Sequence, residues 1–594
     1  MNYIFVSSDK KNLEPLNDVD MKDLKFCIQG QKYLSRVRYL AKSNTRVLDC
    51  YSTQPNISER DVKITGNTVY FFHGYLLDEA PFSGAVLRPQ NNYYGVYSHG
   101  MVCDENCHFA SDELGLSPIY YSQQGGYFFV SNNPHLIAAY KMRLGFRIHA
   151  EKTLPVWHTI GITIESDVTG YEGIFRVRPW RYISIDCQNQ INFPSKNKTE
   201  VPEDYDAACE SGLEQLRKGM NTIRTKYNKL GAQLTGGMDS RLVLAYIMNA
   251  GSQRDFKFIT GGAEGNPDIT VARMLADKYG LAHSHIPYDV KPKPTEKLDT
   301  WVKEICMSNA METCLVRTSG RQDQWLTPSL DEAILNGMGA TFVKSLDDAQ
   351  IVENNMRKRF KENDIDFEYL TSEQEAYGHI CFDFANVSRF FLKEAGLNIA
   401  NEYRKYIFQY NYRRFPERMN YADAMMTYRY RSHNSNLSTL EKNCIFLYSP
   451  ILQETSRKLT PKERKDAKLY FDLMWRINPE ICFVPLENRK LAPELYTHLP
   501  ADIRRRFSEV PAISGDITSE EQQSLFNDLL PIMRKDMPDM LPSSVFDYIK
   551  SGSIEARLRE DIPYGKPVFA LVNLYGIAKW HDVIEDLNNK HLTK

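Results

Sequence analysis

The stretch that combines the most chemically useful side chains covers residues 234–241 and reads Leu-Thr-Gly-Gly-Met-Asp-Ser-Arg. Gly236 and Gly237 allow the backbone to turn tightly and to approach a ligand closely. Thr235 and Ser240 offer hydroxyl donors on either side of this turn. A helix that begins here would point its free N–H groups at the same place, which makes an anion site suited to a pyrophosphate.

Asp239 is the acidic residue of this stretch, and a bare phosphate would be repelled by it. Its presence makes sense if it holds a Mg²⁺ ion that bridges phosphate oxygens. The pattern differs from the Walker A loop, because the stretch contains no Gly-Lys-Ser or Gly-Lys-Thr. By spacing alone, an ordinary turn between a strand and a helix, with Asp239 as a helix cap, explains the same residues equally well.

The elements that must position this stretch alternate between helical and strand patterns. Apolar residues recur at helical spacing ahead of it, and short β-branched or aromatic runs follow it. The sequence predicts, in order, helix, strand, helix, strand, helix and strand over residues 204–228, 232–234, 241–249, 256–259, 267–279 and 283–286. This alternation predicts an α/β domain with a parallel sheet and crossover helices.

The N-terminal part has a different character. Residues 1–195 are rich in short strand patterns bounded by turn residues, and a polar, proline-bounded linker follows from Pro194 to Pro202. We therefore predict two domains, at residues 1–195 and 203–594. From about residue 350 onward the pattern is mostly helical.

Composition and charge exclude several classes of protein. The chain has 594 residues, of which 42% are hydrophobic and 25% charged, as in a globular protein. A formal net charge of −2 gives no global field that would attract nucleic acid or an anionic membrane. The sequence shows no signal peptide and no apolar run of about 18 residues. The 11 cysteines lack metal-type spacing. We expect a cytoplasmic protein that binds neither nucleic acid nor membrane.

Residues 234–241 resemble the Ser-Gly-Gly-x-Asp-Ser pyrophosphate loop of the N-type ATP pyrophosphatases, with Thr235 in place of the first Ser. More narrowly, the chain resembles the asparagine synthetase family, and further similar segments follow the family's order at residues 72–76, 109–121, 173–179 and 258–262. This resemblance implies an N-terminal Ntn-hydrolase-like αββα sandwich with a glutaminase-like domain at residues 1–195. It also implies a doubly wound parallel-sheet ATP-pyrophosphatase domain with a largely helical C-terminal part.

The resemblance also implies ATP and Mg²⁺ as cofactors and assigns the residues that hold them. The nucleotide would contact Leu234, Thr235, Gly236, Gly237, Asp239, Ser240, Thr260, Gly261 and Gly337, with Asp239 on the metal. Family members also carry a lysine ahead of a Pro-Glu-Ile-like turn, which offsets charge on the transferred phosphate. Lys468 is the first candidate for this role and Lys465 the second, although a solvated basic helix face explains both. Arg429 and Arg431 could face an acidic substrate.

The first domain departs from the family pattern. Glutamine-dependent members use an N-terminal Cys whose free α-amine helps to activate the thiol. Here residue 2 is Asn2, and Cys27 cannot become terminal without processing. His73 replaces the Asn of the family's oxyanion hole, and a packed or surface imidazole explains it as well. We predict that glutaminase activity is lost, as in the β-lactam synthetase and lasso-peptide cyclase branch.

The second domain departs as well. The family's second ATP signature is Gly-Glu-Gly-x-Asp-Glu, whereas this chain has Gly337-Met338-Gly339-Ala340-Thr341, so that Met338 and Thr341 replace acids. Asp347 and Asp348 follow and could supply a metal ligand, or form a plain surface pair.

Two hypotheses follow from these residues. The first is an ATP-dependent ligase that adenylates a carboxylate and passes it to ammonia or an amine, in natural-product, peptide or polysaccharide modification. The alternative is a catalytically degenerate homologue that binds ATP as a regulatory or scaffolding protein. The expected partners are a small-molecule or peptide carboxylate and a nitrogen donor, and a homodimer is left open. A tRNA-modifying or sulfate-activating enzyme is disfavoured by the whole-length resemblance.

Overall fold

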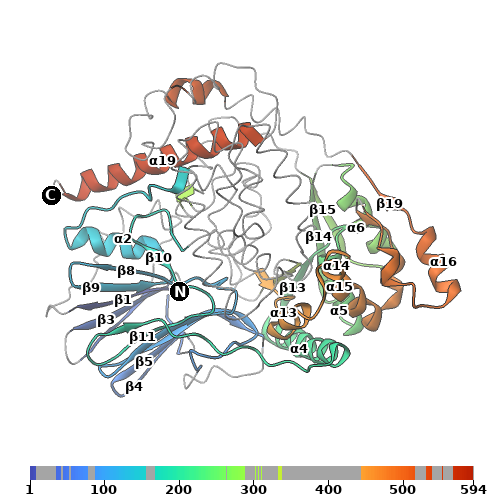
Figure 1. The fold of residues 1–594 in the computed structure, drawn as a ribbon, viewed down its shortest axis with the longest axis horizontal. Helices are drawn as coiled ribbons and strands as arrows, with labels where there is room; N and C mark the ends of the chain where they lie inside the picture. Colours follow the sequence, from blue (N-terminus) through green and yellow to red (C-terminus); the bar gives the residue numbers. More distant parts are fainter. Residues whose placement is uncertain are drawn as a thin grey trace, which may run out of the picture.

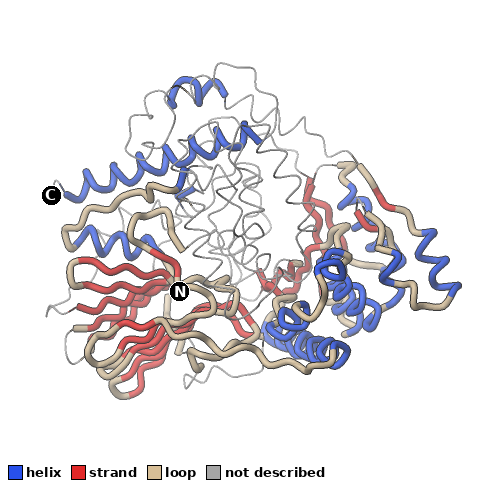
Figure 2. Tube along the Cα trace, viewed as in Figure 1, coloured by secondary structure: helices blue, strands red, loops and turns tan. Residues whose placement is uncertain are grey.

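The computed structural model describes residues 1–8, 35–41, 45–52, 55–59, 61–77, 87–155, 167–262, 264–287, 332–337, 443–487, 489–515, 530–537 and 566–592, with positions 302, 305, 306, 310 and 552. Two groups of strands are visible in Figure 1. Antiparallel sheets built from the N-terminal residues lie on one side, and a sheet with its helices lies on the other. Figure 2 shows how helices dominate the second side.

Two six-stranded antiparallel sheets are built from residues up to Asn192. The first has the order β10-β8-β9-β1-β3-β2, and the second has the order β12-β11-β7-β6-β5-β4. The strands of the first sheet are β1 (Asn2–Ser8), β2 (Ser35–Leu40), β3 (Arg46–Ser52), β8 (Tyr120–Gln124), β9 (Tyr127–Ser131) and β10 (Phe175–Arg176). Those of the second are β4 (Val62–Thr65), β5 (Thr68–Leu76), β6 (Gly95–Val102), β7 (Cys107–Ser111), β11 (Ile183–Ile185) and β12 (Ile191–Asn192).

The two antiparallel sheets pack face to face because alternate residues of their strands are aromatic or aliphatic. The Tyr3 and Phe71 rings lie 4.4 Å apart, and those of Phe5 and Phe109 lie 4.9 Å apart. Helix α2 (Pro134–Arg143), capped by Asn133, covers the outer face of the first sheet. These are three of the four layers that the resemblance implies. The described residues show no helix layer on the outer face of the second sheet.

The second group is a five-stranded sheet of order β15-β14-β13-β16-β17, in which every neighbouring pair is parallel. The predicted parallel sheet with crossover helices is therefore confirmed. Its strands are β13 (Lys229–Gln233), β14 (Phe256–Gly262), β15 (His283–Pro287), β16 (Glu332–Asn336) and β17 (Asn443–Ile445). The connecting helices are α4 (Tyr205–Lys226), α5 (Met238–Asn249) and α6 (Pro267–Tyr279).

The first turn of α5 corrects the sequence prediction, which began this helix at Arg241. The helix begins at Met238, with Gly237 in extended conformation at the N-cap position. Asp239 and Ser240 therefore lie inside the first helical turn. An acidic residue is favourable at that position, because the N-terminal end of a helix carries partial positive charge.

The described part of the C-terminal region is largely helical, as predicted, with one small two-stranded parallel sheet. Residues 338–442 lie outside the described residues. The elements are α13 (Pro450–Ser456), α14 (Pro461–Lys465), α15 (Lys468–Ile477), the 3₁₀ helices η4 (Pro479–Phe483) and η5 (Pro493–Leu495), α16 (Ala501–Glu509), α19 (Lys566–Leu592), and the strands β18 (Leu486–Glu487) and β19 (Ala512–Ile513).

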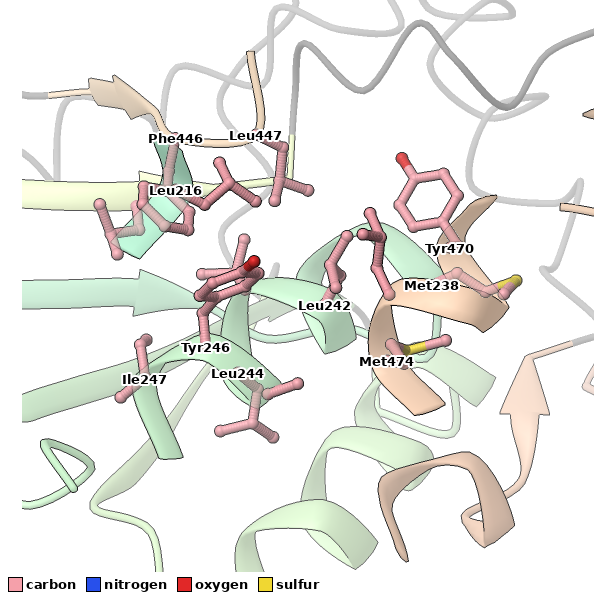
Figure 3. Close-up of a cluster of buried hydrophobic side chains, with 14 of the residues drawn as sticks. Leu216, Met238, Leu242, Leu244, Tyr246, Ile247, Phe446, Leu447, Tyr470 and Met474 are labelled. Atoms are coloured by element: carbon pink, nitrogen blue, oxygen red, sulfur yellow. The ribbon is translucent and has the colours of Figure 1, made fainter. Parts of the chain in front are cut away.

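One hydrophobic core joins the antiparallel and parallel groups. It contains Tyr75, Tyr94 and Leu116 from the antiparallel side and residues of α4, α5 and α15 from the other side. The Tyr94 hydroxyl donates to the carbonyl of Phe446, and a Cβ on Gly219 of α4 would lie 2.6 Å from the Tyr94 ring. Figure 3 shows the part of this core where side chains of α5 and α15 meet. The two groups are thus packed as one unit.

Helix α19 forms a second connection between distant parts of the chain. It passes over α2 on the antiparallel side (Figure 1). Trp580 is fully buried there, and its indole N–H donates to the carbonyl of Gly170 at 2.8 Å. The Asn588 amide exchanges two hydrogen bonds with the backbone of Ile148, at 2.7 and 3.1 Å. The last described helix therefore covers residues of the first 195.

Candidate functional site

The glycine turn lies at the carboxyl end of β13, where α5 begins. The Ser240 hydroxyl accepts a hydrogen bond from the Thr235 N–H at 3.0 Å and lies 2.9 Å from the Thr235 hydroxyl. The Gly237 N–H donates to the Thr235 hydroxyl at 3.2 Å. The two hydroxyls expected to offer donors to a ligand are thus bonded to the turn itself. They fix the shape of the turn ahead of the α5 N-terminus.

Asp268 completes this turn from the next strand–helix unit. Its carboxylate Oδ1 accepts from the Gly236 N–H at 2.6 Å. Asp268 lies in the first turn of α6, whose N-cap is Asn266. The Asn266 side chain accepts from the Asp268 N–H at 2.9 Å. A backbone donor of the glycine turn therefore faces a carboxylate oxygen, which is the type of acceptor that a phosphate also provides.

Two glycines of the site mark close approaches between protein segments. A Cβ on Gly236 would lie 2.7 Å from the Cβ of Glu487 in β18. A Cβ on Gly337, which follows β16, would lie 2.6 Å from the Cβ of Asp239 and 2.9 Å from the Ser240 nitrogen. The structure thus brings Gly337 directly against the first turn of α5. Three segments that are distant in the sequence, containing Gly236, Gly337 and Glu487, converge here.

Thr260 links the central strands below the turn. Its hydroxyl donates to the carbonyl of Leu234 at 2.5 Å and lies 2.8 Å from His283 Nε2 on β15. Burial lowers the pKa of His283, with a further contribution from Arg273. The neutral imidazole fits a position as donor to the Thr260 oxygen. Gly261 follows Thr260 on β14, at the strand end where the resemblance expects the adenine.

Lys468 is the first residue of α15, and its ammonium contacts described groups. It donates to Asp472 at 2.8 Å and lies 5.2 Å from the centre of the Tyr205 ring. The Tyr205 hydroxyl donates to the same carboxylate at 2.9 Å. Helix α15 packs against α5, whose first turn carries Asp239. Lys468 as the catalytic lysine remains a prediction.

Several predicted residues lie outside the described residues. These are Cys27, Met338, Thr341, Asp347, Asp348, Arg429, Arg431 and the side chain of Lys465. In the described part of the chain, no three His, Cys, Asp or Glu side chains are grouped to hold a metal ion. The chemistry of Asp239 nevertheless suits Mg²⁺, which takes one or two protein carboxylates and fills its other positions with phosphate oxygens and waters.

Both departures from the glutaminase pattern, Asn2 and His73, lie on described strands. Asn2 lies at the start of β1 opposite Tyr51 of β3. The Met1 amine lies 3.4 Å from Nδ1 of His73 on β5. The start of β1 therefore lies near His73, the residue that the resemblance places at the oxyanion hole.

Sequence reasoning missed three residues that shape the turn. These are Asp268, Glu487 and Arg241, whose contacts with the turn region the sequence does not predict. Their partners lie 32 or more residues away in the chain. No local pattern signals such contacts. The hydrogen-bonding capacity of Asp268 beside an Asn-Pro helix start was the available hint.

The fold and the site define a class of protein. A glycine turn between a parallel strand and a helix N-terminus, at the carboxyl edge of the sheet, is typical of proteins that bind nucleotide phosphates. The family model described as Asparagine synthase matches residues 216–322. This segment contains the turn, β14, α6 and β15.

A curated relative points the same way. "Probable asparagine synthetase [glutamine-hydrolyzing]" from Acanthamoeba polyphaga mimivirus is 26% identical over 142 residues. That match covers 20% of this chain and 26% of the relative, so the chain spans about a quarter of its length. Together with the family model, it confirms the predicted resemblance to the asparagine synthetase family.

Solved structures give weaker likenesses. A glutamine phosphoribosylpyrophosphate amidotransferase from B. subtilis, complexed with ADP and GMP, has 8% identity and a TM-score of 0.22, covering 58% of this chain and 83% of that chain. A glutamine-dependent NAD⁺ synthetase from Acinetobacter baumannii, in complex with ADP, has 12% identity and a TM-score of 0.15, covering 38% and 49%. TM-scores this low do not establish a common fold. No helix in the described part of the chain is both long and apolar enough to cross a bilayer.

Proposed function

We propose that this chain is an ATP-dependent amide-forming ligase that adenylates a carboxylate. The observation that carries the proposal is the turn at residues 235–240, which joins the carboxyl end of β13 to the N-terminus of α5. The N-terminus of α5 has no side-chain cap and would offer its helix-end positive charge to a polyphosphate. The match of residues 216–322 to the Asparagine synthase model supports it.

In the proposed reaction, a carboxylate oxygen of the substrate attacks the α-phosphorus of ATP. The bond between the α-phosphorus and the bridging oxygen breaks, and pyrophosphate leaves toward Gly236 and Gly237. A nitrogen nucleophile then attacks the acyl carbon, AMP leaves with the substrate oxygen, and the nitrogen loses a proton. Asp239 would hold Mg²⁺, which supplies charge neutralisation at the phosphates. Ammonia or an amine is the nitrogen source, in natural-product, peptide or polysaccharide modification.

The alternative is a degenerate homologue that binds ATP as a regulatory or scaffolding protein. One observation favours it specifically: the Gly236 N–H already donates to Asp268 at 2.6 Å, so a pyrophosphate oxygen must displace a carboxylate there. The acids missing at Met338 and Thr341 point in the same direction. Both hypotheses use the turn to bind ATP, so the turn does not separate them. The match of residues 216–322 to the Asparagine synthase model favours the ligase.

The direct test is product analysis with carboxylates labelled with ¹⁸O, incubated with MgATP and hydroxylamine as a general nitrogen nucleophile. Adenylation predicts AMP and pyrophosphate, a hydroxamate, and one ¹⁸O atom in the AMP. ADP and orthophosphate as sole products would exclude adenylation. ATP binding without turnover, across a broad panel of carboxylates, would support the alternative.

A variant pair assigns the reaction to the turn. Asp239→Asn should abolish AMP release while the protein stays folded, because a neutral amide is a poor ligand for a hard cation. The matched control is Asp255→Asn, which changes an exposed acid in the turn after α5. A wild-type rate of AMP release in Asp239→Asn would show that Asp239 is not a metal ligand and only stabilises the N-terminus of α5.

A further inference from the structure

Arg241 is a buried cation one residue beyond the first turn of the site. Its side chain is 1% exposed. Among the described residues, its guanidinium donates to backbone carbonyls and not to a carboxylate, and its Nε has no partner there. Burial lowers the pKa of its guanidinium to about 10, so the group is still charged at neutral pH. A buried charge without a counter-ion is costly, and such a group requires a specific reason.

The hydrogen bonds of Arg241 all go to one distant segment. Nη1 donates to the carbonyl of Val484 at 2.6 Å and to that of Ile481 at 3.5 Å. Nη2 donates to the carbonyl of Pro485 at 2.5 Å. The planar guanidinium thus holds three carbonyls with two of its nitrogens. A lysine ammonium is a point donor on a shorter reach and cannot reproduce this fork.

This segment leads directly to the glycine turn. Two residues after Pro485, the Glu487 N–H donates to the carbonyl of Gly236 at 3.2 Å. The Glu487 side chain leaves no room for a Cβ on Gly236, which would lie 2.7 Å away. Residues 486–487 form β18, which lies against α6 and pairs with β19. Residues 484–487 therefore pack along one side of the glycine turn, and we call this segment the wall.

We propose that Arg241 is a positioning residue of the nucleotide site. By holding the carbonyls of residues 481–485, it fixes β18 against Gly236 and so sets the shape of the pocket that receives the polyphosphate. This inference rests on the proposed function for its ligand. The wall itself is a property of the structure that can be measured without any ligand.

The experiment compares Arg241→Lys and Arg241→Met with Arg46→Lys. Arg46 is an equally buried arginine, 1% exposed, that donates to the carbonyls of Cys103 and Asp104 at 2.8 and 3.0 Å, far from the turn in the antiparallel sheets. Three quantities are measured for each full-length protein: amide hydrogen exchange at residues 484–487 and 236–237, affinity for MgATP by calorimetry, and the thermal midpoint.

For Arg241→Lys we expect faster exchange confined to residues 484–487 and 236–237, and MgATP affinity weakened about tenfold by the lost hydrogen bonds. Arg241→Met should show a larger loss, because it leaves the carbonyls without donors. Arg46→Lys should lower the thermal midpoint without changing affinity or exchange at the turn. Unchanged exchange at residues 484–487 in both Arg241 variants would overturn the inference, as would equal loss of affinity in Arg46→Lys. If the wild type does not bind MgATP, the proposed function is wrong. Amide hydrogen exchange at residues 484–487 and 236–237 then still tests whether Arg241 holds the wall in place.

Discussion

At the scale of single residues, the glycines of the site have a role that the sequence only half predicts. The pattern indicated that Gly236 and Gly237 let the backbone approach a ligand. The structure shows that Gly236 and Gly337 also let protein segments approach each other, at Glu487 and at Asp239. A side chain at either position would push apart the segments that build the pocket.

Gly337→Ala tests this packing. The new methyl group would lie 2.6 Å from the Asp239 Cβ and 2.9 Å from the Ser240 nitrogen, so the first turn of α5 must move. We expect overpacking to lower the free energy of unfolding by about 1–3 kcal/mol. The free energy of MgATP binding should fall by more than this amount. Urea unfolding and calorimetry measure the two effects.

The control for this substitution is Gly231→Ala on the neighbouring strand β13. There the nearest atom to the new methyl group would be Ile334 Cγ1 at 3.4 Å, an ordinary contact. This variant should keep its affinity for MgATP. Full affinity in Gly337→Ala would show that the α5 turn does not depend on this contact.

The residues that the sequence could not predict share one physical feature. Asp268, Glu487 and Arg241 act through contacts with residues that are remote in the chain, and a linear pattern carries no information on such pairs. By contrast, the turn at residues 235–240 could be predicted, because its glycines, hydroxyls and following helix are adjacent. The sequence therefore predicts the turn itself, but not the distant residues that pack around it.

At the scale of elements, periodicity predicted most of the parallel sheet. The predicted helix over 204–228 is α4, and the predicted strand at 256–259 is part of β14. The start of α5 was misplaced by three residues, because Met238-Asp239-Ser240 carries no apolar spacing that would mark it as helix. The ends of a helix depend on capping geometry and not on the apolar stripe, so hydrophobic periodicity predicts them poorly.

Strands β6 and β7 carry a pair of histidines that makes the stability depend on pH. Burial is the main reason that the pKa of His99 lies well below its usual value of 6.5, and burial lowers that of His108 to about 4. The rings lie 6.1 Å apart. In the unfolded chain both groups would titrate near their usual pKa.

The sign of the effect follows from these shifts. Between pH 6.5 and 4 the unfolded state binds more protons than the folded state, so stability falls as the pH falls through this range. A His99→Gln and His108→Gln double variant, which cannot take up these protons, should lose less stability between pH 7 and 5 in urea unfolding. The control is His149→Gln, at an exposed position. A pH dependence identical to wild type in the double variant would contradict the assignment.

At the scale of the whole molecule, two separate contacts join the antiparallel sheets to later parts of the chain. The core shared through Tyr94 and the contact of α19 with Ile148 and Gly170 both tie the antiparallel sheets to the C-terminal part. These contacts give residues 1–195 a structural role that does not depend on the predicted loss of glutaminase activity. The apolar face of these residues is part of the core that supports α4 and α5.

Trp580→Ala measures how much α19 contributes. The indole ring is fully buried and lies 5.1 Å from the Tyr171 ring and 6.1 Å from that of His135. Removing it leaves a cavity, and we expect a loss of about 3–5 kcal/mol in the free energy of unfolding. Trp580→Phe keeps most of the apolar bulk but loses the hydrogen bond to Gly170, and it should cost less. Equal stability of all three proteins would mean that α19 is not docked in solution.

The source of nitrogen involves both parts of the chain. If glutamine is the source, residues 1–195 must hydrolyse it. Glutamine hydrolysis needs an activated nucleophile, and the Asn2 side chain is an amide that cannot attack another amide. The described cysteine nearest in the sheet is Cys50, beside Asn2's partner Tyr51 on β3. It is buried, and burial raises the pKa of its thiol, so it stays protonated and unreactive.

We therefore expect no glutamate when the purified protein is incubated with glutamine, ATP and Mg²⁺, and amide formation with ammonia or an amine but not with glutamine alone. Asn2→Cys should not restore hydrolysis, because His73 still occupies the position of the oxyanion-hole Asn beside the Met1 amine. Glutamate release is measured against a heat-inactivated sample. Release above that control, blocked by a glutamine analogue that alkylates thiols, would show that a cysteine of this chain does the work that Asn2 cannot.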